Sequence, residues 1–219
     1  MPGGEKAIYE TNRIAYALLH QAMGDESSRF PLEDWLGFSR SESVHLKQIL
    51  DKKIHCSQTT SMGRLFDGVA SLVLGIHQVS YEGEAASCLE SIADGRSTDP
   101  YPMPLIDAGD FIYLDWRPMI RAMVADRLNG RSPAHMSDRF HQGLAFAGME
   151  IASKFPQKDG VLGGGCFINR RLVENMLLLF RKAGRPLFIP SHLPCGDGGI
   201  AAGQLAIALA NQKQANHQI

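Results

Sequence analysis

Two glycine-rich stretches near the C-terminus decide the fold: V-L-G-G-G-C-F-I-N-R-R-L at Val161–Leu172 and L-P-C-G-D-G-G-I-A-A-G at Leu193–Gly203. Each stretch places its glycines between an apolar run and a helix-like segment. Backbone N–H groups of such a turn can approach an anion without interference from a Cβ, and the N-terminus of the following helix adds a favourable dipole. The stretches therefore favour two phosphate-handling corners, although an isolated double glycine more often marks only a tight turn.

The last third of the sequence alternates between strand-like and helix-like segments. The expected order is strand Gly160–Leu162, helix Asn169–Ala183, strand Pro186–Ile189 and helix Gly198–Ala210. Such alternation is typical of parallel strands with covering helices, and ligands collect at the carboxyl ends of such strands. We therefore expect both glycine turns at one sheet edge, with Gly164, Asn169 and Asp197 close to one another.

The first half is expected to be mainly helical. Apolar spacing predicts helices over Glu5–Met23, Ser41–Ile54 with Ser41 as a candidate N-cap, Ser61–Leu74, Ala85–Ala93, Arg117–Leu128 and Ser132–Ser153, and the A-G-D loop predicts a hairpin between Leu105–Asp107 and Phe111–Asp115. The sequence thus favours a single α/β domain over 1–219. It divides into a mainly helical part over 1–58, an α/β part over 59–210 and a frayed polar tail over 211–219.

Composition restricts the class of protein. The chain has 219 residues, 44% hydrophobic residues and a formal net charge of −1, which argues against a nucleic-acid binder. It has no apolar run long enough to cross a bilayer, and M-P-G-G-E-K at its start lacks the apolar core of a signal peptide. We expect a cytoplasmic protein that partners neither nucleic acid nor membrane.

The cysteines and histidines do not form a recognisable metal motif. Cys56, Cys88, Cys166 and Cys195 are too far apart for a C-x-x-C pair, and no two histidines lie three or four positions apart, so a zinc finger is excluded. Cys166 and Cys195 lie inside the glycine turns without a nearby histidine base. They are interpreted as small hydrophobic residues rather than nucleophiles. His141 and His192 are assigned core or surface roles.

Four blocks resemble, in the same order, segments of the hydrogenase maturation carbamoyltransferase family HypF. They are P-G-G-E-K-A-I-Y-E-T-N-R-I-A at Pro2–Ala15, T-S-M-G-R-L-F-D-G-V-A at Thr60–Ala70, V-S-Y-E-G-E-A-A at Val79–Ala86, and the two glycine stretches together. The resemblance covers the C-terminal lobe of the Kae1-like module. It implies one lobe of an actin-like ATPase (ASKHA) type fold, with a parallel or mixed sheet, covering helices and a helical N-terminal part.

The resemblance also implies site residues. The nucleotide-binding positions are Asp67, Glu82, Gly83, Gly164, Gly165, Asn169 and Gly198, and the metal position is Asp197. Four of them have a simpler alternative: Asp197 could cap a helix, Asp67 could be an exposed helix aspartate, Glu82 could occupy a first turn, and Asn169 could cap a helix whether or not it also contacts the nucleotide. No catalytic residue is assigned.

The family chemistry would be carbamoyl transfer from carbamoyl adenylate to the C-terminal cysteine of a HypE-like acceptor protein. The implied cofactors are ATP or AMP, and a divalent iron or zinc ion that requires a missing first lobe. That lobe could be a separate subunit, or the exposed face could form a homodimer. Ile168 and Gly196 stand where the family has amide side chains. The chain is therefore expected to be inactive alone, and the alternative is a non-catalytic nucleotide-binding or protein-interaction remnant.

Overall fold

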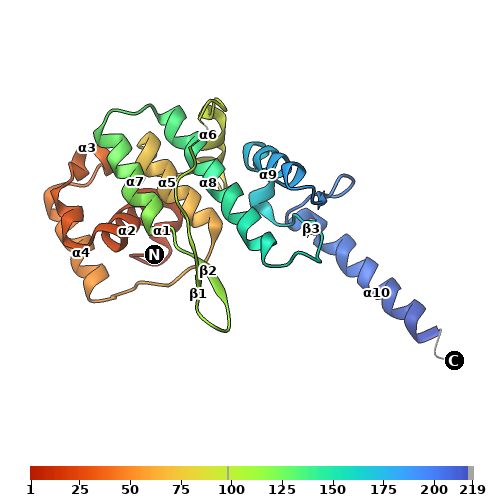
Figure 1. Ribbon diagram of the computed structural model, residues 1–219. Coiled ribbons are helices and arrows are strands. Elements are labelled where there is room, and N and C mark those ends of the chain that lie inside the picture. The colour runs from red at the N-terminus through yellow and green to blue at the C-terminus, as the bar shows by residue number, and fades with distance from the viewer. Residues whose placement is uncertain (98, 217–219) are drawn as a thin grey trace.

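The computed structural model describes residues 1–97 and 99–216, and it is mostly helical (Figure 1). A helical body from α1 to α7 is joined by α8 to a smaller C-terminal part, from which α10 projects. The elements are α1 Lys6–Tyr9, α2 Thr11–Met23, η1 Gly24–Arg29, α3 Leu32–Leu36, α4 Arg40–Asp51, α5 Met62–Leu74, α6 Glu84–Ile92, β1 Leu105–Asp107, β2 Ile112–Leu114, α7 Arg117–Leu128, α8 Pro133–Ser153, β3 Gly160–Val161, η2 Gly165–Ile168, α9 Arg170–Lys182, β4 Leu187–Phe188, η3 Asp197–Gly199 and α10 Ile200–Asn216.

The helical body surrounds one apolar core. Helices α2 and α5 approach so closely at Gly68 that a Cβ there would lie 2.5 Å from Leu18 Cδ1. Phe66 of α5 meets Phe140 of α8 edge-to-face, with ring centroids 4.9 Å apart. Both rings are buried. Aromatic pairs of this geometry add to the hydrophobic stabilisation of a core. Helix α8 is therefore held firmly by the body at one end.

Helix α4 begins differently from the sequence prediction. Ser39, and not Ser41, is the N-cap: its hydroxyl accepts the Glu42 N–H at 3.3 Å, and the Glu42 carboxylate accepts the Ser39 N–H at 2.9 Å. This reciprocal capping box satisfies two backbone N–H groups at once. Ser41 was the wrong choice because Glu42 lies three residues after Ser39. The predicted helix Glu5–Met23 is also divided, since Glu10 has non-helical backbone angles.

The strands are in the predicted places but are short. The hairpin is confirmed, with β1 antiparallel to β2 and Leu105 opposite Leu114. The parallel pairing is also confirmed, with Gly160 of β3 opposite Leu187 of β4. The ladder stops after the Leu162 N–H donates to the Phe188 carbonyl at 2.9 Å. The next position, Pro190, has no N–H to continue it. The predicted sheet with covering helices is therefore only a small two-stranded sheet.

Helix α10 extends further than predicted. It continues through Asn216 into the range 211–219 that the sequence marks as a frayed tail, and residues 217–219 of that range lie outside the described residues. Within the described part of the chain, no helix combines the length and apolar character needed to span a bilayer.

Candidate functional site

The two glycine turns meet, as the alternating pattern predicts. The Gly164 N–H donates to the Cys195 carbonyl at 2.6 Å, which joins the first turn to the second. Gly164 has a φ of +108°, where a side chain would be strained, and a Cβ on Gly199 would lie 2.5 Å from the Pro194 carbonyl oxygen. Glycine is therefore needed at both positions. Gly165 and Gly198 lie in the short helical turns η2 and η3 that follow.

Asn169 is the N-cap of α9, which confirms its simpler interpretation. Its Oδ1 accepts the Leu172 N–H at 2.9 Å, and the side chain is buried. Its amide Nδ2 donates to His141 Nε2 at 3.0 Å, while His141 Nδ1 donates to the Ser137 carbonyl at 2.8 Å. Burial lowers the pKa of His141, so the neutral ring matches these partners. Of the core and surface roles predicted for His141, the core role is confirmed, and the amide of Asn169 is already engaged in the interior.

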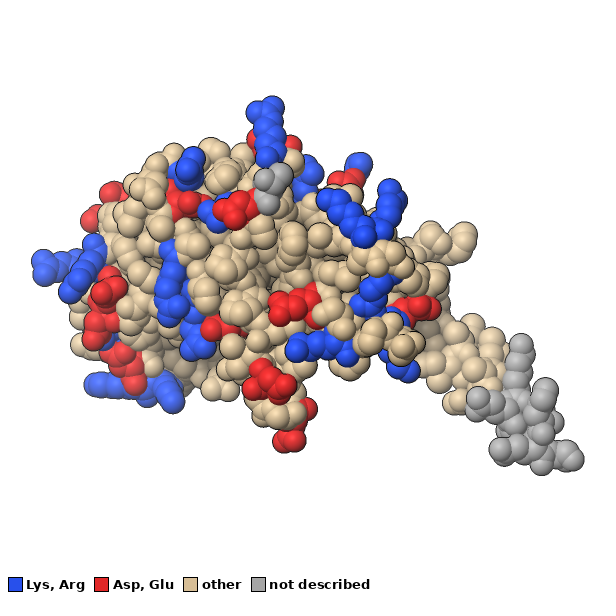
Figure 2. Space-filling view, in the orientation of Figure 1, with Lys and Arg blue, Asp and Glu red and all other residues tan. Residues whose placement is uncertain are grey.

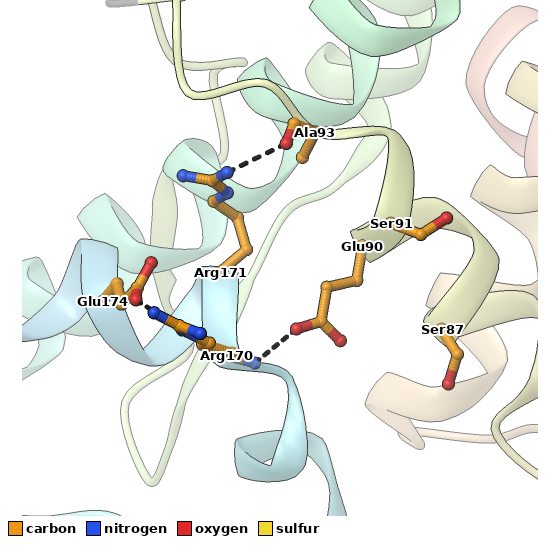
Figure 3. Close-up of a pocket in the computed structure, with 7 residues that line it drawn as sticks. All are labelled: Ser87, Glu90, Ser91, Ala93, Arg170, Arg171 and Glu174. Atoms are coloured by element: carbon orange, nitrogen blue, oxygen red, sulfur yellow. Dashed lines mark hydrogen bonds and ion pairs between the residues drawn. The ribbon is translucent and has the colours of Figure 1, made fainter.

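A hollow of about 480 Å³ lies between α6 and the N-terminal end of α9 (Figure 3). This volume is in the range of small-molecule sites. The lining residues are Ser87, Glu90, Ser91 and Ala93 from the α6 side and Arg170, Arg171 and Glu174 from α9. The Glu90 carboxylate accepts the Arg170 N–H at 2.7 Å, and so occupies the helix terminus as an internal anion.

Arg171 is held in the hollow by neighbouring backbone. Its Nη2 donates to the Ala93 carbonyl at 2.9 Å, and its guanidinium lies against Gly95, where a Cβ would be 2.9 Å from Nη1. The buried Asp138 carboxylate accepts the N–H groups of Gly95 and Arg96, both at 2.9 Å. Asp138 of α8 thereby fixes the loop against which Arg171 rests.

Asp67 is buried, so the alternative of an exposed helix aspartate is wrong. Only 3% of the residue is exposed, and Arg64 Nη1 lies 3.0 Å from Asp67 Oδ2. This ion pair lacks hydrogen-bond geometry, and within the described part of the chain Oδ2 has no hydrogen-bond partner. Burial, opposed by Arg64 and assisted by the negative charge of Glu82, raises the pKa of Asp67 to about 6.

Glu82 and Gly83 lie directly before α6, and Glu82 is near enough for its charge to raise the pKa of Asp67. Gly83 is the residue before the helix, with a φ of +87°, and Glu82 is exposed. Glu84, and not Glu82, occupies the first turn, and its carboxylate accepts the Ser80 N–H at 2.6 Å. Gly83 lies about 10 Å along α6 from Glu90, seven residues later, and the Glu90 carboxylate contacts Arg170 next to Asn169. The predicted nucleotide residues thus form two groups, one at each end of α6.

Asp197 is exposed on the second glycine turn. In the part of the chain that the structure describes, no three histidine, cysteine, aspartate or glutamate side chains come together as a metal-binding group. One carboxylate does not match the ligand sets that iron or zinc takes in proteins. The donor set of this chain alone therefore does not fit the implied metal.

Cys166 and Cys195 are free thiols. Burial raises the pKa of Cys166, which reduces the thiolate fraction that a nucleophile needs. The interpretation of Cys166 as a small hydrophobic residue therefore agrees with its surroundings.

Sequence reasoning missed the residues that line the hollow. Arg170 and Arg171 stand in the quoted motif directly after Asn169, so the arginine pair was a signal that could have been used. Glu90 and Ser87 follow the third motif in an ordinary amphipathic helix. Only the folding of α6 against α9 reveals their position.

The family model for the carbamoyltransferase Kae1-like domain, second subdomain, matches residues 1–204. The chain belongs to this family. The second-subdomain chain is 36% identical over 217 residues to the carbamoyltransferase HypF of Synechocystis sp., covering 93% of this chain and 28% of that protein. It is 29% identical to a carbamoyltransferase HypF homolog of Cupriavidus necator, covering 95% of this chain and 55% of that protein.

Solved structures agree with this assignment. A crystal structure of full-length HypF in its phosphate- and nucleotide-bound form superposes with a TM-score of 0.83 at 28% identity, covering 95% of this chain and 27% of that one. The structure of T. kodakarensis HypF superposes with a TM-score of 0.77 at 26% identity, covering 95% of this chain and 28% of that one. The chain therefore spans about a quarter of the length of these HypF proteins.

Proposed function

We propose that this second subdomain supplies one wall of a nucleotide site of the actin-like ATPase (ASKHA) type, which a first subdomain completes. The observation that carries the proposal is the meeting of the two glycine turns, joined by the Gly164 to Cys195 hydrogen bond, beside the capped start of α9. Membership of the HypF carbamoyltransferase family supports it, as does the nucleotide-bound form of the full-length HypF structure. ATP, AMP or carbamoyl adenylate is the proposed ligand.

Each group of site residues has a proposed role. The carboxylates of Asp67 in α5 and of Glu82 before α6 would accept hydrogen bonds from ribose hydroxyls, and Gly83 would leave room for the sugar beside them. Gly165 and Gly198 would bring backbone N–H groups to the phosphate, and Gly164, whose N–H is engaged with the Cys195 carbonyl, would let the chain make the turn. Asn169 would act mainly by holding the start of α9, because its amide is engaged with Leu172 and His141.

The proposed reaction of the whole protein is carbamoyl transfer to a HypE-like acceptor. The sulfur of the acceptor cysteine attacks the carbamoyl carbon, a C–S bond forms, the C–O bond to the adenylate phosphate breaks, and AMP and the thiol proton leave. This chain's residues would orient the adenylate and stabilise charge at its phosphate, without a covalent enzyme intermediate. Asp197 would contribute a single carboxylate to a metal held mainly by the first subdomain.

The isolated chain should bind nucleotide weakly and turn nothing over. A single wall lacks the second half of the phosphate contacts, so we expect a Kd for AMP on the order of 0.1 mM or weaker, or about 5 kcal/mol. Isothermal titration with AMP, ATP and carbamoyl phosphate, with and without a divalent metal, tests the proposal. Turnover by the isolated chain, or stoichiometric iron or zinc in it, would contradict the need for a first subdomain.

A variant pair sharpens this test. Asp67→Asn should weaken AMP binding severalfold, whereas the matched change Asp110→Asn on the exposed hairpin loop should leave it unchanged. Asp197→Ala should affect only metal-dependent ATP binding.

A non-catalytic remnant is the second candidate. It is favoured by Ile168, which is 73% exposed at the first glycine turn where the family resemblance places an amide side chain. If neither AMP nor ATP binds to the chain at millimolar concentration, alone or with a first subdomain, the remnant is the better description.

A further inference from the structure

A short chain of hydrogen bonds runs through the interior of the protein. Charged side chains of both signs are spread over the face of the molecule that Figure 2 shows, whereas Ser137, His141 and Asn169 are polar and buried. The Ser137 hydroxyl donates to the Leu89 carbonyl at 2.6 Å, and His141 Nδ1 donates to the Ser137 carbonyl at 2.8 Å. The chain of bonds continues through Asn169 to the Leu172 N–H. It therefore connects α6, α8 and α9.

His141 sets the direction of this chain of bonds. A neutral imidazole has one N–H donor and one acceptor nitrogen. Because Nδ1 donates to the Ser137 carbonyl, Nε2 is the acceptor, and it faces the NH2 group of Asn169 at 3.0 Å. The oxygen of the Asn169 amide must then point the other way, toward the Leu172 N–H at 2.9 Å. The tautomer of one buried ring thus decides which end of the Asn169 amide caps α9.

The packing of the ring reaches a further helix. His141 is 0% exposed and meets the rings of Phe66 and Phe140 edge-to-face, with centroids 5.7 and 5.6 Å away. Phe66 directly precedes Asp67 in α5, which carries a proposed ribose contact. The same imidazole therefore contacts the helix of Asp67 and the cap of α9, so it lies between the two groups of proposed site residues.

We propose that His141 is a positioning residue of the nucleotide site, which holds the start of α9 in place through the Asn169 amide. The nucleotide part of this proposal rests on the proposed function. His141 is completely buried, so it acts through Asn169 and not by contact with the ligand. Without the Nε2 acceptor, the NH2 group of Asn169 would be buried without a partner, and the amide could turn its oxygen away from Leu172. A histidine that only filled space in the core would have no such effect on the cap.

Two replacements of His141 separate positioning from packing. His141→Asn can place an NH2 group near the position of Nδ1 and keep the Ser137 contact, but its side chain ends before it reaches Asn169. His141→Gln is longer and can present its amide oxygen to Asn169 in place of Nε2. The two variants therefore differ mainly in the acceptor that Asn169 needs.

Hydrogen exchange at the Leu172 N–H gives the first measurement. This N–H lies in the first turn of α9, where no acceptor within the helix serves it, so its protection reports the Asn169 cap. Exchange in the full chain should become about fivefold faster in His141→Asn, which corresponds to the loss of a typical cap, and should return close to the parent rate in His141→Gln. Phe140→Leu is the matched control, because it changes the packing beside the ring and leaves the acceptor in place.

Binding of AMP gives the second measurement. His141→Asn should weaken AMP binding by about threefold to tenfold, and His141→Gln should recover most of it. The double variant His141→Asn with Asn169→Ala should bind AMP no more weakly than Asn169→Ala alone, since both changes remove the same effect. Additive losses would show two independent roles and would overturn the proposal, as would unchanged exchange at Leu172 in His141→Asn.

A further variant covers the case in which His141→Asn does not fold. Asn169→Asp keeps a capping oxygen but presents a carboxylate to His141 Nε2 in place of the NH2 donor, so the ring should take up a proton at higher pH than in the parent. Ring-nitrogen NMR measures this, and an unchanged titration would contradict the contact. If exchange at Leu172 responds as expected while no protein binds AMP or ATP at millimolar concentration, His141 still positions Asn169 and the nucleotide function is removed.

Discussion

The helical body and the C-terminal third differ in how completely they cover their apolar side chains. In the body, Phe66, Phe140 and Leu19 are almost completely buried, whereas in the C-terminal third Val161, Phe188 and Leu205 are more than half exposed. The body is thus a finished core, whereas the core of the C-terminal third is unfinished, since part of its apolar surface stays open to solvent. Composition alone does not show which apolar side chains the fold covers.

The largest expected effect comes from a pair of phenylalanine deletions. Phe66→Ala removes a ring packed against Phe140 and should lower the free energy of unfolding by about 3–5 kcal/mol. Phe188→Ala removes a 55% exposed ring from β4 and should change it by less than about 0.5 kcal/mol. Urea unfolding followed by circular dichroism measures both. Similar losses for the two variants would end the distinction between a finished and an unfinished core.

The next effect concerns the junction between the two regions. Asn169→Ala removes the cap of α9 and leaves His141 Nε2 without its donor, so unfolding should become easier by about 2 kcal/mol. Asn169→Ser keeps a capping hydroxyl and should recover about half of that loss. Chemical denaturation compares the three proteins. Equal stability of Asn169→Ala and the parent would show that the junction does not depend on this side chain.

A comparable but pH-dependent effect is expected at Asp67. The folded-state pKa of about 6 lies above the usual value of 3.8, so the folded protein binds an extra proton between these values, and stability should fall as pH rises from about 4 to 6. The loss should be on the order of 2 kcal/mol. Asp67→Asn should remove this pH dependence, whereas Asp110→Asn should keep it. Unfolding titrations at pH 4, 5, 6 and 7 measure it, and a rise in stability over that range would contradict the assignment.

The smallest effect tests the start of α4. Ser39→Ala should cost about 1 kcal/mol, because the capping box with Glu42 is lost. Ser41→Ala, two residues later, should change the free energy of unfolding by less than about 0.5 kcal/mol. Thermal melts of the two variants would rank them, and a larger loss for Ser41→Ala would restore Ser41 as the cap.

Local signals predicted the elements well. Apolar spacing located helices such as Arg117–Leu128, and the A-G-D loop located the hairpin, because these depend on neighbours in sequence. The size of the sheet could not be predicted, because it depends on the register of β3 against β4, which places Pro190 where the next N–H donor would be needed. To predict the cap of α4 correctly, one has to prefer Ser39, which has Glu42 three residues later, to Ser41.

Only the part of the site that lies in a sequence motif could be predicted. The meeting of the glycine turns followed from strand–turn–helix alternation, and the Gly164 to Cys195 hydrogen bond confirms that the turns adjoin. The burial of Asp67 could not be read from helical spacing, because it depends on how α2 and α6 pack against α5. Glu90 had no signal at all, since its role depends on the contact of α6 with Arg170.

The carboxylate of Asp138 has a genetic consequence. It holds Gly95 and Arg96, and Gly95 in turn confines Arg171, so a change at a helix residue that lines no hollow should reposition an arginine that does. A screen for lost function should therefore recover substitutions at Asp138 and Gly95 together with those at Arg171. Second-site suppressors of an Arg171 defect should arise in the same loop. A genetic screen should therefore identify residues 94–97 as part of the site even though they need not contact the ligand.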